Sequence, residues 1–253
     1  MASPEALIRD FVFPLIIAKK IGKGEVAMVS FLGTGFLIGS RGFALTASHV
    51  VKAELPEDHA IVGMFVEPAS NSWKVWNADV CDHHTTEDVA LLKMRDGNWP
   101  DSAFTVSFEK QFSALPYMLF GYPSANLYEK VNDVAPDGTV RGRPDLIYSA
   151  GHIRRRATFA IPGVRGTNFY ELSQPVGRGC SGSPVFRARG QTWEVVGIYV
   201  ADQAISVPFE TLDKNLDPVI RTLEMPGALA YAVRMDALAG WCPNVLNANL
   251  SLA

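Results

Sequence analysis

The glycine-rich segment from Gly177 to Pro184 reads Gly-Arg-Gly-Cys-Ser-Gly-Ser-Pro and holds residue types that could do chemistry. Three glycines around one serine allow unusual backbone angles and let a ligand approach the main chain closely. If this turn points its N–H groups into one concavity, the amides of Gly179 and Ser181 would form an oxyanion hole beside the Ser181 hydroxyl. A serine is a weak nucleophile until a base takes its proton, so a catalytic role requires a histidine and a group that orients it. Taken alone, a glycine-serine turn is more often only a turn.

One of the five histidines is placed where a base could act. His49 follows the apolar run Phe43–Thr46, among small residues and at a turn of the chain. Its ring could therefore be fixed by its neighbours and still face a cleft. The alternative is a buried histidine with satisfied hydrogen bonds and no catalytic role.

The other four histidines are weaker candidates. His83 and His84 lie in a polar run with a cysteine and an aspartate, which could suggest a metal site. Neighbouring side chains on a strand face opposite ways, however, so we interpret this run as a surface turn. His59 lies among charged residues and is expected to be exposed, and His152 opens a basic stretch.

The acid that would orient His49 is best sought at Asp88. Its carboxylate stands directly before the apolar run Val89–Leu92. There it can lose its water and accept a hydrogen bond from an imidazole N–H, which fixes the tautomer of the ring. Asp79 and Asp82 are competitors, and the plain alternative is an aspartate satisfied by its own turn.

Short apolar segments, rich in β-branched and aromatic residues and bounded by Gly, Pro, Asn or Asp, are typical of strands. We expect two sets of about six strands, joined by the polar stretch 95–102, so that the chain divides into an N-terminal lobe 1–102 and a C-terminal lobe 103–253. The first set is Val26–Leu32, Gly35–Ile38, Phe43–Thr46, Ala60–Val66, Trp73–Trp76 and Val89–Lys93. The second is Pro116–Tyr122, Leu146–Tyr148, Arg155–Phe159, Pro184–Phe186, Trp193–Tyr199 and Ala230–Val233.

Helical patterns are scarce in this sequence. The expected helices are Pro4–Arg9, Leu212–Leu223 and a terminal helix at Met235–Ala239. The stretch Pro123–Asp145 is rich in Asn, Asp, Gly and Pro. Long loops of this kind in compact domains are usually functional or mobile.

The composition is that of an ordinary globular chain, with 253 residues, 48% hydrophobic and 19% charged, and a formal net charge of -3. This balance gives no electrostatic reason to expect a nucleic acid or an anionic membrane as the main partner. The three cysteines, Cys81, Cys180 and Cys242, are too few and too scattered for a disulfide framework or a zinc cluster. We interpret all three as thiols.

The apolar run Phe11–Ile17 lies close to the N-terminus but does not resemble an export signal. Glu5 and Asp10 precede it and Lys19 and Lys20 follow it, which is the wrong charge pattern. The run is also shorter than the about 20 apolar residues that a membrane helix needs. The sequence therefore predicts a cytoplasmic protein.

Four motifs in a fixed order give the sequence a family resemblance. They read Gly-Thr-Gly-Phe, Leu-Thr-Ala-Ser-His-Val, Glu-Asp-Val-Ala-Leu-Leu and Gly-Cys-Ser-Gly-Ser-Pro, at Gly33–Phe36, Leu45–Val50, Glu87–Leu92 and Gly179–Pro184. Together they resemble the chymotrypsin-like (trypsin-like) serine peptidases, and the closest likeness is to the intracellular and bacterial members. Four ordered motifs are far more specific than any one of them.

The resemblance implies an all-β fold of two six-stranded antiparallel Greek-key barrels with a C-terminal helix, and an active site in the crevice between the barrels. It implies that Ser181 is the nucleophile, His49 the general base and then acid, and Asp88 its orienter. The amides of Gly179 and Ser181 would hold the oxyanion. Such an enzyme forms an acyl-enzyme and needs neither a metal nor an organic cofactor.

One departure from the family concerns activation. Secreted members carry an aspartate directly before the nucleophile, where it pairs with a newly cut N-terminus, and here Cys180 stands in that place. That switch is therefore not expected. The pocket must be ordered constitutively, by a regulatory protein partner or by the loop 123–145. Cys180 is also a rival nucleophile, because viral relatives use cysteine, but they carry it at the position of Ser181.

The specificity pocket departs from the trypsin type as well. Where trypsin-type enzymes place an aspartate at the base of the pocket, this sequence has Pro175, followed by Val176. A strong preference for Arg or Lys by that route is disfavoured. Small or medium apolar side chains are the expected preference.

A pocket wall, and the strand edge that pairs with the substrate backbone, is expected from four consecutive residues, Tyr199, Val200, Ala201 and Asp202. Asp202 or the acidic segment 210–217 could still recruit a basic side chain from the rim. That segment belongs to an insertion, Gln203–Gly227, which no motif aligns.

The leading hypothesis is a cytoplasmic, bacterial-type serine endopeptidase that acts on protein or peptide substrates. One alternative is a protease-fold binding or scaffold protein whose cleft captures a partner segment without cleaving it. Its motives are the missing activation aspartate and the insertion. Another is an esterase that uses the same triad on small acyl substrates.

Overall fold

The computed structural model describes residues 8–22, 26–67, 72–95, 97–123, 145–189, 192–212, 214, 217–246 and 250. Most of the long loop predicted at Pro123–Asp145 and most of the helix predicted at Pro4–Arg9 lie outside these residues. Within the second of these predictions, Ile8 and Arg9 are helical.

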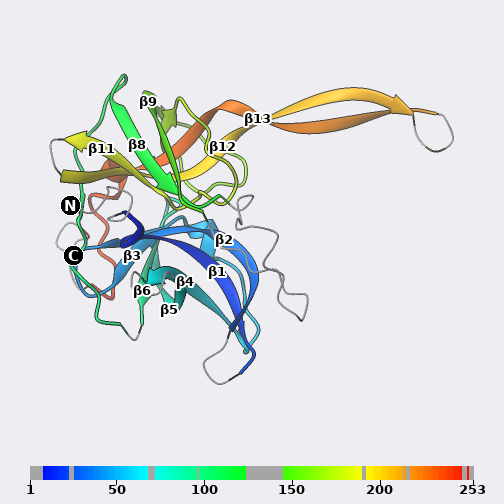
Figure 1. The fold of residues 1–253 in the computed structure, drawn as a ribbon. Coiled ribbons are helices and arrows are strands. Elements are labelled where there is room, and N and C mark those ends of the chain that lie inside the picture. The colour runs from blue at the N-terminus through cyan, green and yellow to red at the C-terminus, as the bar shows by residue number, and fades with distance from the viewer. Residues whose placement is uncertain are drawn as a thin grey trace.

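The N-terminal lobe is a closed barrel in which the strand order is β1-β2-β3-β6-β5-β4 and every neighbouring pair is antiparallel. β1 and β4 close it, with Leu15 opposite Gly63. Figure 1 shows this barrel in blue and cyan, below the second lobe. Its strands are β1 (Val12–Lys20), β2 (Val26–Ile38), β3 (Phe43–Thr46), β4 (His59–Glu67), β5 (Ser72–His83) and β6 (Ala90–Met94).

The apolar run Phe11–Ile17 near the N-terminus forms most of strand β1. Phe13 and Leu15 on one face belong to the main core, whereas Ile16 and Ala18 pack in a separate small cluster with Val62. A strand that is buried on both faces is apolar without alternation. The run is therefore the strand that closes the first barrel.

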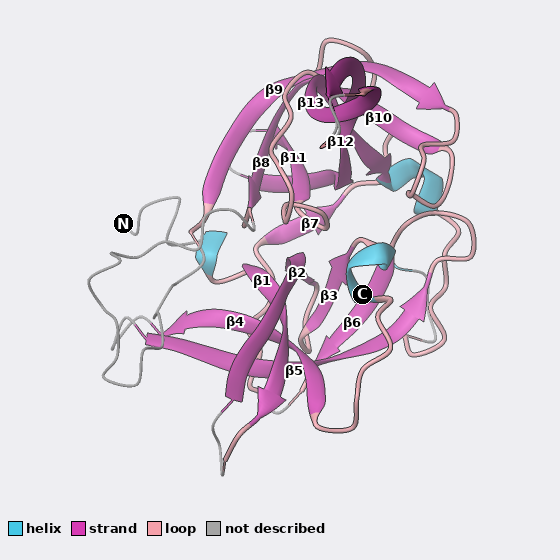
Figure 2. Cartoon of the chain, turned by 90° about the vertical axis from the view of Figure 1, so that its right-hand side faces the viewer, coloured by secondary structure: helices cyan, strands magenta, loops and turns pink. Residues whose placement is uncertain are grey.

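The C-terminal lobe is a second sheet in the order β11-β8-β9-β10-β13-β12-β7, and a further pairing of β11 with β12 closes six of its strands into a barrel. β7 adds to the edge of β12 in parallel. The prediction of an all-β fold with two six-stranded barrels is confirmed, and Figure 2 shows the two sheets one above the other. The strands are β7 (Phe104–Val106), β8 (Pro116–Gly121), β9 (Ile147–Thr158), β10 (Asn168–Leu172), β11 (Pro184–Arg189), β12 (Thr192–Leu212) and β13 (Pro218–Arg234).

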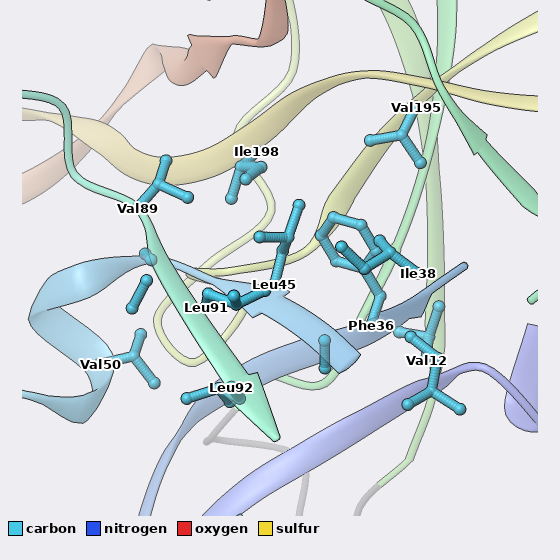
Figure 3. Packing of buried hydrophobic residues seen from close by; sticks show 14 of the residues in the cluster. Val12, Phe36, Ile38, Leu45, Val50, Val89, Leu91, Leu92, Val195 and Ile198 are labelled. Atoms are coloured by element: carbon cyan, nitrogen blue, oxygen red, sulfur yellow. The ribbon is translucent and has the colours of Figure 1, made fainter. Parts of the chain in front are cut away.

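The two lobes share one hydrophobic core. Val195 and Ile198 of β12 belong to the same buried cluster as Leu45 of β3 and Leu91 of β6, and Figure 3 shows these side chains converging between the ribbons. Burial of such side chains is the main favourable term in folding. The shared core holds the end of β3, the start of β6 and the barrel part of β12 in one place, and the candidate site lies there.

Two predicted helices are wrong. Leu212–Leu223 is not a helix: its described residues form the end of β12 and the start of β13, because Val219 and Ile220 pair across the hairpin with Thr211 and Glu210. The β-branched residues favour this pairing over their helical spacing. The predicted terminal helix is also not seen, because Met235–Leu238 forms a single 3-10 turn, η2, which Gly240 and Pro243 prevent from continuing.

The insertion Gln203–Gly227 forms a long two-stranded arm. β12 and β13 continue beyond the barrel, paired from Ala204 opposite Pro226 to Leu212 opposite Pro218. In Figure 1 the arm extends in yellow and orange away from both lobes.

The predicted lobe boundary at 102 and 103 falls between β6 and β7. The three cysteines are free, with Cys180 buried and Cys242 exposed. Among the described residues, no helix is both long and apolar enough to cross a membrane.

Candidate active site

The ends of two paired strands bring His49 and Asp88 together. β3 leads directly into the 3-10 turn η1 (Ser48–Val51), which carries His49, and Asp88 stands shortly before β6. Thr46 at the end of β3 lies opposite Ala90 at the start of β6 in the antiparallel pair. His49 and Asp88 therefore lie at the same end of the barrel.

Asp88 binds His49 twice. One carboxylate oxygen accepts the His49 main-chain N–H at 2.9 Å, and the other lies 2.5 Å from His49 Nδ1. The Asp88 side chain is 1% exposed and that of His49 is 36% exposed. Because a carboxylate only accepts hydrogen bonds, this geometry places a proton on Nδ1 and leaves Nε2 to accept one. The pair is therefore arranged as a base and its orienter.

The loop that carries Ser181 has a backbone that only glycine adopts readily. Gly177, Gly179 and Gly182 have φ of 103°, 95° and 91°. The loop is closed by the bond from the Ser183 amide to the Cys180 carbonyl at 2.9 Å, and the Gly182 amide donates to β12 at 2.7 Å.

The amides of Gly179 and Ser181 donate to no acceptor in the part of the chain that the structure describes. An oxyanion requires main-chain N–H donors of this kind, which are not already engaged by a described residue and which stand close in sequence to a serine hydroxyl. The structure thus keeps the two predicted oxyanion-hole amides available.

Thr34 fastens this loop to the first barrel. Its main-chain N–H donates to the Ser181 carbonyl at 2.8 Å, and its hydroxyl donates to the Gly179 carbonyl at 3.1 Å. The same hydroxyl accepts the Tyr122 amide at 3.0 Å. Thr34 is fully buried, so these bonds are shielded from water. Its role was missed in the sequence, although it stands inside the first of the four motifs.

Two glycines make the close contact possible. A Cβ at Gly33 would lie 2.7 Å from the Ser181 carbonyl oxygen and 2.8 Å from a methyl group of Val50. A Cβ at Gly182, where φ is positive, would overlap the Thr34 carbonyl. Gly33 therefore lies between the serine loop and the residue that follows His49, and it brings the two halves of the site together.

The Ser181 hydroxyl donates to the Val200 carbonyl of β12 at 3.0 Å. Within the described residues no hydrogen bond joins it to the His49 ring. In the absence of substrate, catalytic hydrogen bonds are often long or poorly aligned, so this arrangement is compatible with a catalytic serine.

A cavity of about 610 Å³ opens beside Ser181. Of the predicted pocket residues, Tyr199, Val200, Ala201 and Asp202 line it, whereas Pro175 and Val176 do not. The rest of its lining comes from the serine loop and from the root of the arm, namely Gly177, Arg178, Gln203, Ala204 and Met225. A separate cavity of about 230 Å³ borders His49 and Asp88.

The Asp202 carboxylate is engaged inside this wall. It accepts the amides of Val176 at 3.0 Å and Gly177 at 2.9 Å, and also the Tyr199 hydroxyl. Burial, and then the charge of Asp202, raise the pKa of Tyr199 far above its usual range, so the phenol stays a donor. Asp202 thus holds the start of the serine loop.

Cys180 is fully buried. Burial and the nearby Asp202 raise the pKa of its thiol far above the usual range. Because the thiolate and not the thiol is nucleophilic, burial makes Cys180 a poor nucleophile. Ser181 is then the better candidate nucleophile of the loop.

His84 corrects the prediction of a surface turn. It is 9% exposed, and its Nδ1 accepts the amides of Thr86 at 3.2 Å and Glu87 at 3.0 Å. Burial lowers the pKa of its ring. His83 lies closer to the site, with Nδ1 2.7 Å from the Ser48 hydroxyl. No cluster of metal-binding side chains occurs among the residues that the structure describes.

Glu87, the neighbour of Asp88, was missed as a link between the lobes. It is almost fully buried and accepts the Asn168 side-chain amide at 2.8 Å. Arg234 in turn donates to the side-chain oxygen Oδ1 of Asn168 at 2.5 Å. These bonds connect the segment that carries Asp88 to β10 and β13. In the sequence, the only signal for this role of Glu87 is its place next to Asp88 in the third motif.

The two closed barrels, with the Asp88–His49 pair on one and the serine loop of the other docked against it, define a chymotrypsin-like fold. A family model described as the trypsin-like peptidase domain matches residues 33–198. The chain therefore belongs to the trypsin-like peptidase family. A search of curated proteins finds no match.

Several solved structures share the fold. The protease domain of MamO from Magnetospirillum magneticum, in its apo form, has a TM-score of 0.56 at 14% identity, over 92% of this chain and 96% of that chain. The HtrA-type protease AlgW with a decapeptide has a TM-score of 0.56 at 15% identity, over 90% of this chain and 62% of that chain. An inactive form of Rv3671c from M. tuberculosis H37Rv has a TM-score of 0.50 at 16% identity, over 90% of this chain and 83% of that chain.

Proposed function

We propose that this chain is a serine endopeptidase that hydrolyses peptide bonds of protein substrates through an acyl-enzyme on Ser181. The observation that carries the proposal is the buried Asp88 carboxylate, which accepts both the main-chain N–H and the ring Nδ1–H of His49. A carboxylate held in this way stabilises the imidazolium that forms when the ring takes a proton.

In the proposed reaction, His49 Nε2 takes the proton of the Ser181 hydroxyl while Oγ attacks the scissile carbonyl carbon. The amides of Gly179 and Ser181 hold the oxygen that becomes negative. His49 then gives its proton to the leaving amine as the C–N bond breaks. A water molecule repeats the sequence on the ester and releases the acid.

The proposed substrate side chain at the cleaved bond is apolar and of small or medium size. Asp202 supports this, because its carboxylate already accepts two amides and a phenol and has little capacity left for a substrate cation. The AlgW structure, a relative in fold, was solved with a decapeptide. A regulatory protein partner and the cytoplasmic location stay predictions.

The test is the cleavage profile of a peptide library with the wild type and with Ser181→Ala. Cleavage by the wild type that is lost in the variant supports the proposal. Cys180→Ala is the matched control, because it removes the neighbouring thiol and leaves the triad intact. Cleavage that persists in Ser181→Ala, or no cleavage by a folded wild type, would contradict the proposal.

A second candidate is a binding protein that captures a segment in the cleft without cutting it. The hydrogen bond from Ser181 to the Val200 carbonyl, in place of one to His49, is the observation that favours it. It predicts that the wild type binds library peptides and returns them intact.

A further inference from the structure

The arm formed by β12 and β13 has one apolar face and one mixed face. Side chains directly opposite each other in an antiparallel pair share a face. Ile205 lies opposite Met225 and Val207 opposite Leu223. We name the apolar arm face after the five large apolar side chains on this side, Ile205, Val207, Phe209, Leu223 and Met225. Arg221, opposite Phe209, lies on the same face nearer the tip of the arm.

Each of these five side chains is exposed, from 41% for Val207 to 51% for Leu223. A two-stranded ribbon without a third strand or a packed face is marginally stable in water. A contiguous exposed apolar patch of this kind marks an interaction site. The apolar arm face is therefore a candidate site for the binding of another polypeptide.

The root of the arm opens into the cavity of Ser181. Ala204 and Met225, which lie at the root of the arm on β12 and β13, line that cavity together with Ser181. Met225 also belongs to the apolar arm face, so one side chain lines both the cavity and that face. The cavity has polar lining as well, from Arg178, Asp202 and Gln203, and a segment that leaves it along Val200, Ala204 and Met225 would meet the arm.

The outer edge of β12 is open along the same path. As far as Ile198 this edge pairs with β11, where Pro184 lies opposite Ile198, and Tyr199 bonds to the serine loop. At Ala201–Ile205 and at Val207–Leu212 no described residue forms a main-chain hydrogen bond with this edge. An unpaired edge accepts an extended peptide as an added strand.

We propose that the arm is an extended substrate-binding surface, and that its occupant is the part of the substrate polypeptide that continues from the cleaved bond as a strand with apolar side chains at alternate positions. The proposal rests on the proposed peptidase function. The arm from Ala204 to Leu212 would accommodate a segment of about nine residues, at about 3.4 Å per residue. The enzyme would thus select substrates by an exposed or unfolded apolar strand as well as by the side chain at the cleaved bond.

The experiment compares a short peptide that the enzyme cleaves with two peptides lengthened by nine residues, one of alternating Val and Ser and one of Ser only, on either side of the cleaved bond. The ratio of kcat/KM, lengthened to short, is measured for each protein. We expect the Val-Ser extension to raise it about tenfold on one side of the bond, mainly through KM, and the Ser extension to have little effect.

The test variant is Val207→Ser with Leu223→Ser, and the matched control is Ile220→Ser, which lies on the other face of the arm and is 80% exposed. We expect the test variant to lose the gain and the control to keep it. Circular dichroism checks that both variants fold. Equal ratios for the Val-Ser and the Ser extensions, or a gain that survives in the test variant, would overturn the proposal.

Binding and oligomeric state separate this proposal from the peptidase function. Anisotropy of a labelled Val-Ser peptide with Ser181→Ala reports the arm without any turnover, so a loss of the arm effect and a lack of peptidase activity are seen independently. Light scattering of the wild type tests the other occupant, a second copy of the chain. A dimer that the test variant converts to a monomer would overturn the proposal.

Discussion

Asp202 accepts a hydrogen bond from the Gly177 amide at 2.9 Å, and this bond joins strand β12 to the first residue of the serine loop. The loop contains three glycines with positive φ and would otherwise sample many conformations. The same carboxylate holds the Val176 amide. Asp202, which lines the cavity beside Ser181, thus orders the start of the loop. Cys180, which stands in the place of the activation aspartate, cannot accept such hydrogen bonds as a carboxylate would.

Replacing Asp202 tests this positioning role. Asp202→Asn keeps the shape but turns one acceptor oxygen into a donor, so one of the two amides loses its partner. We expect kcat to fall about 10- to 100-fold with KM changed much less, because the oxyanion amides lose their fixed orientation. Asp101→Asn, at an exposed aspartate outside both cavities of the site, is the control and should stay near the wild type. An unchanged kcat in Asp202→Asn would show that the loop is ordered without Asp202.

Thr34→Val tests the link between the barrels. The valine keeps the shape but removes the donor to the Gly179 carbonyl and the hydroxyl that accepts the Tyr122 amide. Unsatisfied buried groups cost about 1–3 kcal/mol each, so the free energy of unfolding should fall by that order. Thr34→Ser keeps the hydroxyl and should recover most of it. Urea unfolding of the three proteins measures this, and equal stability of Thr34→Val and the wild type would argue against the link.

Cys180 should be chemically silent. Its raised pKa keeps it a thiol at neutral pH, so iodoacetamide should alkylate the exposed Cys242 and leave Cys180 unmodified in the folded protein. Cys180→Ala should retain most of the peptidase activity. Peptide mapping by mass spectrometry measures the labelling. Rapid alkylation of Cys180 with loss of activity would contradict this prediction and support Cys180 as the nucleophile.

His84 should make the fold sensitive to acid. Its pKa is lowered by burial in the folded chain, so the unfolded chain binds the proton more readily. The stabilisation by the neutral ring is complete above the unfolded pKa of about 6.5 and is lost as the pH falls from there through the folded pKa. The free energy of unfolding should therefore decrease from pH 7 to pH 5. His84→Gln should flatten that slope, and an identical slope in both proteins would disprove the contribution.

Much of the site could be predicted because its signals are local. Thr46 and His49, like Asp88 and Ala90, are close in sequence, so short apolar runs that end in a polar residue placed both catalytic candidates at strand ends. The Ser181 loop could be predicted because its positive φ angles require glycines at fixed positions.

The rest depends on partners far away in the chain. Nothing near Asp202 indicates that its carboxylate binds the amides of Val176 and Gly177, and the exposed or buried state of His84 depends on Trp241, whose ring lies 5.3 Å from it. Within the arm, Leu212–Leu223 was predicted as a helix from its sequence pattern. Cross-strand pairing with β12 outweighed that pattern, as tertiary context often does.

Labelling by a fluorophosphonate probe, followed by peptide mass spectrometry, tests the central claim most directly. The account predicts one adduct, on Ser181, in the wild type, no adduct in Ser181→Ala, and labelling slowed by about 10⁴-fold in Asp88→Asn, the loss that this change causes in a serine peptidase triad. A folded wild type that does not react, or an adduct that persists in Ser181→Ala, would contradict the assignment of Ser181, His49 and Asp88 as a working triad.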